Sequence, residues 1–384
     1  MIHSPGDVAS LRDLLRSAFS SATPTRITGA GTWLDAGRPV SAYQTLSTAQ
    51  LTGVVEYTPG DLVITVRAGT TLRDIELITA PHGQMLALDP FCTANGLDTA
   101  TIGATVATAS SGALAHGFGR VRDLALGCTF VSGDGTVVRG GGRVVKNVAG
   151  FDLVRLTTGA WGTLGVISDV SLRLHARPIV DETFAIALAD LRTLDDTIAM
   201  LNSAPLLANA STLASLVILG GTLPTSLSAH QQLRGASAIL LCRAMGNRAR
   251  VDAQHTALRQ LGDLVSLDTL VWRDVRSCDS GQLSARLADA PSRTAALVRN
   301  ALESLSAIAH SSLTIIVEPL RGAVRVSAHI ASDTPFALPA HAVLERAPAA
   351  FWAAHASHVS DTVSVRLRAM FDPASILNPG ILGA

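Results

Sequence analysis

Three glycine-containing segments in the first half of the chain have residue types that suit a phosphate-bearing ligand. The first follows an expected short strand at residues 25–28. Its small residues let backbone N–H groups approach an anion. A lone Gly-x-Gly is nevertheless a weak signal, because ordinary turns share it, so the neighbouring segments decide its role. The candidate phosphate cradle consists of Gly29, Ala30, Gly31, Thr32 and Trp33.

The second segment, residues 101–112, is a run of small residues with interspersed hydroxyl groups. Such a run is poor core material but suits a flat, polar ligand. The alternative is a buried Ala/Thr helix, which Gly103 and Gly112 disfavour because glycine lowers helix propensity. Two arginines then follow in residues 117–123. The ligand-binding candidates in this region are Ile102, Gly103, Thr105, Val106, Thr108, Ser110 and Arg120.

The third segment, residues 159–167, begins an expected strand with three glycines. Glycines in a strand leave backbone groups open to an approaching ring or ribose. Taken alone, the segment could equally be a bulge at a sheet corner. Its candidate residues are Gly162, Gly165, Val166 and Ile167.

Four motifs occur here in the order seen in p-cresol methylhydroxylase-type FAD-binding domains, which the chain therefore resembles. They are Gly-x-Gly-Thr, Thr-Ile-Gly-x-Thr-Val-Ala, Gly-x-Val-Arg-Asp and Gly-Thr-Leu-Gly-Val-Ile. Residues 141–152 also resemble the Lys-Asn-Val-Ala-Gly-Tyr-Asp stretch of glycolate oxidase E subunits, with Phe151 in place of the usual Tyr. The resemblance is strongest over residues 51–178, returns at residues 371–380 and is weak between them.

The resemblance implies an α+β fold in three parts. Residues 1–178 would form a two-subdomain FAD-binding domain, residues 179–355 an α+β cap, and residues 356–384 a C-terminal segment that packs back on the FAD domain. The cradle at residues 29–33 and residues 103–110 would hold the FAD diphosphate through backbone N–H groups. Residues 162–167 would lie along the adenosine and ribityl parts.

Hydrophobic periodicity predicts the elements that position these segments. In the first part we expect a helix at 7–19, strands at 51–57 and 62–68, a helix at 71–80, a hairpin of 128–131 with 136–139, and a strand at 166–174. In the cap we expect strands at 183–188, 313–318 and 323–330, and helices at 190–202, 248–264 and 341–355.

Composition excludes several classes of protein. Hydrophobic residues are 48% of the 384 and charged residues 16%, yet no stretch reaches the ~18 to 20 unbroken apolar residues of a membrane span. Lys+Arg and Asp+Glu are 30 each, so the net charge is +0 and nucleic acid is not an expected partner. The N-terminus shows no targeting pattern, so we expect a cytoplasmic protein.

The four cysteines, Cys92, Cys128, Cys242 and Cys278, stand far apart without a Cys-x-x-Cys pair. This spacing argues against zinc sites, iron–sulphur clusters and a disulfide framework, so buried free thiols and no metal are expected.

The resemblance supplies the cofactor, FAD, and two functional hypotheses. The chain is either the FAD-binding subunit of a 2-hydroxy-acid (glycolate) oxidase in glycolate catabolism, or a non-catalytic FAD-containing subunit that supports a catalytic partner. The implied partners are a D-type flavin subunit and an iron–sulphur subunit, through which the complex would lie at the inner membrane. An NAD-dependent Rossmann enzyme is disfavoured, because the loop at Gly29 lacks the third glycine that opens a helix.

FAD is expected to be non-covalent. Covalent relatives attach the flavin through His or Cys in the glycine loops, and residues 29–33 contain neither. His116 is the one nearby residue that could attach it.

Catalytic residues stay unassigned. Lys146, the only lysine of the chain, either stabilises an anionic reduced flavin or is a surface residue left by chance. The His-x-x-Glu-His cluster of hydroxy-acid-oxidising relatives is not found in the cap sequence. Arg321, Arg325 and His329 could contact a carboxylate, but alternation on a hairpin favours a solvated face.

Overall fold

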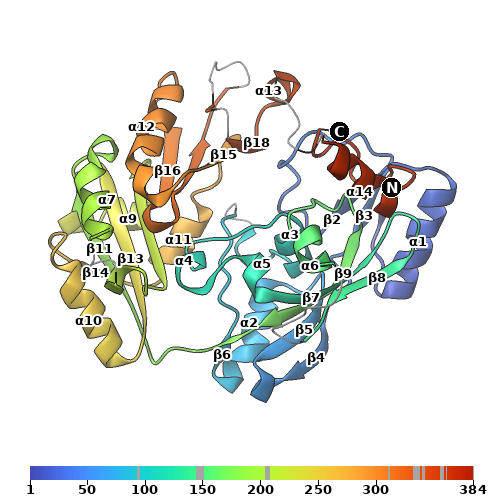
Figure 1. Ribbon diagram of the computed structural model, residues 1–384, viewed down its shortest axis with the longest axis horizontal. Helices are drawn as coiled ribbons and strands as arrows, with labels where there is room; N and C mark the ends of the chain where they lie inside the picture. Colours follow the sequence, from blue (N-terminus) through green and yellow to red (C-terminus); the bar gives the residue numbers. More distant parts are fainter. Residues whose placement is uncertain are drawn as a thin grey trace.

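The protein consists of two parts that lie side by side (Figure 1). A computed structural model shows an N-terminal part built on a five-stranded and a three-stranded sheet, and a second part built on one eight-stranded sheet. Both chain ends lie on the N-terminal part (Figure 1). The described residues are 1–92, 96–143, 151–203, 208–309, 312–331, 338–339, 342–354, 359 and 361–383.

A small parallel sheet of order β1-β3-β2 opens the N-terminal part. The helix predicted at residues 7–19 is confirmed as α1, and Asp7 caps it by accepting the Ser10 N–H at 2.7 Å. Leu11 of α1 is fully buried in a core that also contains Ile376 and Leu377 near the C-terminus. The elements are β1 Ile2–His3, α1 Val8–Ser20, β2 Thr25–Thr28 and β3 Gln44–Ser47.

The five-stranded sheet is antiparallel, with the order β4-β5-β9-β7-β8. The predicted hairpin is confirmed as β7 and β8. Helices α2, α3 and α5 contribute buried side chains to the core of this sheet. The elements are β4 Val54–Thr58, β5 Val63–Arg67, α2 Leu72–Thr79, β6 Gln84–Met85, α3 Ile102–Ala107, α4 Ala115–Phe118, α5 Val121–Leu124, β7 Ala125–Val131, β8 Val137–Gly141, α6 Leu153–Thr157, β9 Val166–Arg173 and β10 His175–Ala176.

The eight-stranded antiparallel sheet runs β14-β11-β13-β12-β16-β17-β15-β18. Its central strands are buried on both faces. Neighbouring side chains point to opposite sides of a strand, so a single strand contributes to two core clusters. Phe184 and Ile186 join one core cluster, whereas Ala185 joins the other. The strands are β11 Val180–Leu188, β12 Ser215–Gly221, β13 Ala238–Gly246, β14 Val265–Leu267, β15 Leu283–Ala288, β16 Leu313–Glu318, β17 Ala323–Ala328 and β18 Val343–Arg346.

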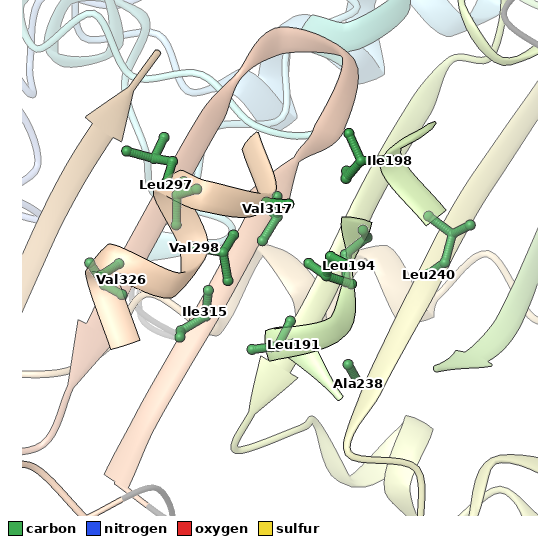
Figure 2. Close-up of a cluster of buried hydrophobic side chains, with 14 of the residues drawn as sticks. Leu191, Leu194, Ile198, Ala238, Leu240, Leu297, Val298, Ile315, Val317 and Val326 are labelled. Atoms are coloured by element: carbon green, nitrogen blue, oxygen red, sulfur yellow. The ribbon is translucent and has the colours of Figure 1, made fainter. Parts of the chain in front are cut away.

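Helices α7, α10 and α12 cover one face of this sheet, and Figure 2 shows their side of the core, where Leu297 and Val298 lie beside Ile315, Val317 and Val326. Helices α9 and α11 cover the other face, together with Phe91 and Ala113 from the N-terminal part. The helices are α7 Asp195–Leu201, α9 Thr225–Ser228, α10 Arg248–Leu258, α11 Val271–Ser277, α12 Thr294–Ser304, α13 Ala349–Ala354 and α14 Thr362–Phe371.

The predicted helix at 341–355 is wrong in its first half. Its residues 343–346 form β18, which pairs with β15, and α13 starts only after Pro348. The alanine-rich sequence favours a helix, but pairing with an available sheet edge overrides that propensity.

The C-terminal segment returns to the N-terminal part. The N–H of Thr25 donates to the carbonyl of Ile376 at 2.7 Å, and the N–H of Asn378 donates to the carbonyl of Thr25 at 3.0 Å. The segment thereby borders β2 at the start of the candidate cradle. Among the described residues, none of the helices has the length and apolar character that crossing a membrane requires.

Candidate cofactor site

The three glycine segments meet at one pocket of about 690 Å³, a volume that includes its open mouth. The cradle loop follows β2, α3 forms one wall, and the start of β9 forms another. The pocket therefore joins the two sheets of the N-terminal part. The predicted residues that line it are Gly29, Gly31, Thr32, Trp33, Gly103, Thr108, Gly162, Gly165, Val166 and Ile167.

Helix α3 presents different residues to the pocket and to the core. Ile102 and Val106 are fully buried in the core of the five-stranded sheet, whereas Gly103, Ala104 and Ala107 line the pocket. The segment is thus a helix that is buried on one side, because a helix buries residues at i and i+4 on one side, and ligand binding by its other side stays a prediction.

The remaining candidates of this region lie behind the pocket wall. The hydroxyl of Thr105 donates to the carbonyl of Thr101 at 2.9 Å, and Ser110 shares a 2.9 Å hydrogen bond with Thr108. Both side chains are buried. Ala30 is exposed at the tip of the loop.

The cradle offers unpaired donors. Within the described part of the chain, the backbone N–H groups of Ala30, Gly31, Thr32 and Trp33 donate no hydrogen bond. The hydroxyl of Thr101 is buried without a partner, and a side chain at Gly29 would collide with it. The loop residues are exposed or only partly buried, and an anionic ligand with several oxygen atoms, such as a diphosphate, suits their free N–H groups.

The other glycines are required mainly by the packing of the protein itself. A Cβ at Gly103 would lie 2.6 Å from the Cβ of Ala68, and one at Gly165 would lie 2.5 Å from the ring of Phe130. Gly162 has a φ of +71°, which residues with a side chain rarely adopt. These glycines bring pocket walls together and leave the space between them open.

Asn378 is the main site residue that the sequence did not reveal. Its Oδ1 accepts the N–H of Ile27 at 2.7 Å, and its Nδ2 donates to the carbonyl of Trp161 at 2.7 Å. It is 3% exposed and lines the pocket. Its only sequence signal was the turn-rich character of the tail.

The cradle is also held by the eight-stranded sheet. Trp33 and Trp161 make an edge-to-face contact with centroids 6.0 Å apart, and the guanidinium of Arg346 lies 5.9 Å from the ring of Trp33. The N–H of Gly37 donates to the carbonyl of Glu345 at 2.8 Å. Strand β18 therefore fixes the loop that follows the cradle.

Two further pockets adjoin the first, and the three together are called the trough below. The second pocket shares Thr108, Trp161 and Ile381 with the first. The third shares Ala109, Arg286 and Val343 with the second, and each of the two has a volume of about 820 Å³ that includes open solvent. An extended ligand held at the cradle would reach the space between the N-terminal part and the eight-stranded sheet.

The far end of the trough is cationic. Arg120, Arg286 and Arg325 line it together with Glu318 and the ring of Phe91. Arg120, a predicted cofactor residue, thus lies away from the first pocket, which it does not line.

The solvated-face interpretation of the β16–β17 hairpin is wrong for Arg325. This side chain is 7% exposed and bonds both Asp279 and Glu345 at 2.6 Å. The N-terminal part and β18 cover the face that the hairpin alternation assigned to solvent. His329 is exposed.

Lys146 lies outside the described residues. The Nε2 of His116 lies 2.9 Å from the carbonyl of Ala210, and burial lowers the pKa of the ring. All four cysteines are free thiols. Among the described residues, no three His, Cys, Asp or Glu side chains gather in a way that could hold a metal ion.

Comparison with known proteins agrees with this geometry. A family model described as an FAD binding domain matches residues 1–141. Glycolate oxidase subunit GlcE of Escherichia coli is 40% identical over 168 residues, which are 44% of this chain and 47% of that protein. D-lactate dehydrogenase of Archaeoglobus fulgidus is 31% identical over 171 residues, 44% of this chain and 37% of that protein.

The fold is shared with solved structures at low sequence identity. 4-Ethylphenol oxidase from Gulosibacter chungangensis superposes with a TM-score of 0.68 at 14% identity, covering 100% of this chain and 88% of that one. The matched segments span less than half the length of these curated relatives. Residues 1–141 therefore match an FAD binding domain, and the chain is similar to a glycolate oxidase E subunit.

Proposed function

We propose that this chain is the FAD-binding subunit of a complex that oxidises a small 2-hydroxy acid such as glycolate. The observation that carries the proposal is the trough, which runs from the cradle at residues 29–33 to the cationic pocket at Arg120 and Arg286. A flavin held at one end and an acid at the other would meet between the two parts of the protein. The names of the relatives, glycolate oxidase and D-lactate dehydrogenase, support the same reaction class.

Each residue group then has a defined task. When bound, FAD supplies the two-electron acceptor. The N–H groups of residues 30–33 would hold the diphosphate, and the residues at 162–167 would lie along the adenosine and ribityl parts. Thr108, Ala109 and Trp161 line the trough between its two ends.

A second candidate function is a non-catalytic FAD-containing subunit that supports a catalytic partner. Glu318 is the only carboxylate that lines the third pocket among the described residues. It is bound to the Nε of Arg321 at 3.1 Å, so it is not a free base that could take the substrate's hydroxyl proton. This pairing favours the supporting role.

We propose a D-type flavin subunit and an iron–sulphur subunit as partners. Electrons that reach the flavin need an exit, and the four separate free thiols offer no cluster ligands. The eight-stranded part, within residues 179–355, is the proposed contact surface, and any association with the inner membrane would go through the partners.

Anaerobic titration with glycolate tests the two candidates. The flavin absorbance of the isolated chain and of the complex purified from its native cell would be followed side by side. Reduction in both supports the catalytic role. If a flavin of the complex is reduced while the flavin of this chain remains oxidised, the result favours the non-catalytic subunit. No reduction in either preparation contradicts the 2-hydroxy-acid assignment.

A further inference from the structure

The far end of the trough holds an unbalanced cluster of arginines. Four of them have carboxylate partners. Arg325 bonds both Asp279 and Glu345, and Arg286 pairs with Glu345. Arg346 pairs with Asp279 and, at a longer distance, with Asp35. Arg321 pairs with Glu318. The fifth, Arg120, pairs with none of the described residues.

Two of the paired arginines are forced together by the sheet. Arg286 on β15 lies directly opposite Arg325 on β17, and like charges in this position repel. Glu345 lies between them and contacts both. Its negative charge is therefore already compensated by these two guanidinium groups, and it does not neutralise Arg120.

Arg120 reaches the same pocket from the N-terminal part. It is half-buried at the start of α5, and its backbone N–H is occupied by Asp123 at 2.8 Å. Burial, followed by the charge of Arg321, lowers the pKa of its guanidinium. In addition, one Nη atom of Arg321 is buried without a hydrogen-bond partner. Arg321 does not itself line the pocket, so among the described residues Arg120 is the guanidinium without a carboxylate partner that faces it.

We propose that this pocket binds the carboxylate of a small organic acid and that the Arg120 guanidinium is its principal partner. The five guanidinium groups face four carboxylates, so the cluster carries one surplus positive charge, which matches a monoanion. Glu318 in the lining disfavours a dianion such as phosphate. The apolar lining, which includes Phe91 and Val324, suits a short carbon chain. A planar carboxylate also matches the guanidinium fork.

The inference rests on the proposed function for the identity of the acid, but binding can be measured without turnover. Acetate and acetamide have the same shape and differ in charge, and neither is a 2-hydroxy acid. Their affinities for the flavin-loaded protein would be compared by ligand-observed NMR titration, with inorganic phosphate as the dianion. Wild-type protein should bind acetate at least about tenfold more tightly than acetamide, the size of one charge-assisted hydrogen bond.

Arg120→Gln should abolish this preference and leave the FAD content unchanged. Arg120→Lys, which keeps the charge but loses the fork, should weaken acetate binding several-fold, and it covers the case in which the glutamine variant does not fold. Arg122→Gln is the matched control, because Arg122 is 59% exposed and lies 3.8 Å from Asp123.

Equal binding of acetate and acetamide by the wild-type protein, tighter binding of phosphate, or unchanged acetate binding in both Arg120 variants would overturn the inference. These outcomes are distinct from a failure of the proposed function. If the chain binds acetate through Arg120 but glycolate does not reduce its flavin, the carboxylate site is supported and the proposed reaction is contradicted.

Discussion

The side-chain amide of Asn378 donates a 2.7 Å hydrogen bond to the backbone carbonyl of Trp161, 217 residues earlier in the chain. The same side chain accepts the N–H of Ile27 on β2. Trp161 itself has a φ of +53°, which is unfavourable for a residue with a side chain. The C-terminal segment thus holds together two walls of the cofactor pocket.

Replacing Asn378 by Ala should lower both stability and flavin content. Two partly buried backbone groups would lose their partners, which costs about 1–3 kcal/mol in the free energy of unfolding. Chemical denaturation and the ratio of flavin to protein absorbance measure the two effects. Asn202→Ala is the control, since Asn202 is exposed and its side chain bonds the carbonyl of Ile198 in its own helix. Full flavin content and unchanged stability in Asn378→Ala would contradict the assigned role.

Gly103→Val and Gly162→Val should abolish FAD binding. At Gly103 the new side chain would strike Ala68 and displace α3. At Gly162 it would strike the Nδ2 of Asn378, 2.9 Å from the added Cβ, and it would also oppose the positive φ. Flavin content of the purified variants is the measurement. Gly6→Val, where nothing lies within 4 Å, should bind FAD normally. A folded variant at either site with normal flavin content would refute the assignment.

The sequence predicted the glycine loops and most elements around them, because these features are local. The strand at residues 313–318 and the hairpin of β7 and β8 follow directly from alternation and turn residues. Long-range partners were not predictable. Asn378 became a site residue only when the tail returned to β2, and Arg325 became buried only when the two parts of the chain met.

The same limit applies within the candidate site. A run of small residues indicated a ligand at residues 101–112, but it did not show that Ile102 and Val106 point into the core. The spacing of Ile102 and Val106 could have indicated this orientation, because residues four apart lie on the same face of a helix.

His116→Ala should retain FAD. The imidazole contacts the carbonyl of Ala210 and lines none of the three pockets of the trough, so its loss should cost only about 1 kcal/mol of stability. Flavin content and denaturation midpoint would be measured together. Loss of flavin from a stably folded variant would reopen the question of a covalent link.

Asp89 should make the protein less stable as the pH rises from about 4 to about 6. Burial raises the pKa of its carboxyl group to about 6, so over this window the folded state binds more protons than the unfolded state. The stability present at low pH is lost as the pH passes the folded pKa, by about 3 kcal/mol in total.

Asp89→Asn isolates this effect, because its side-chain oxygen can still accept the N–H of Leu114, which lies 3.0 Å from Oδ1. The difference in unfolding free energy, variant minus wild type, should increase between pH 4 and pH 6. Asp13→Asn, at a site that is 67% exposed, should show no such increase. A pH-independent difference for Asp89→Asn would contradict the burial argument.

The visible spectrum of the purified protein, taken before and after acid precipitation, tests the central claim most directly. The account predicts a flavin band in the native protein and a yellow supernatant after precipitation, identified as FAD by its mass, because the cradle at residues 29–33 binds through hydrogen bonds alone. A colourless native protein that does not take up added FAD, or a flavin that stays with the precipitate, would contradict it.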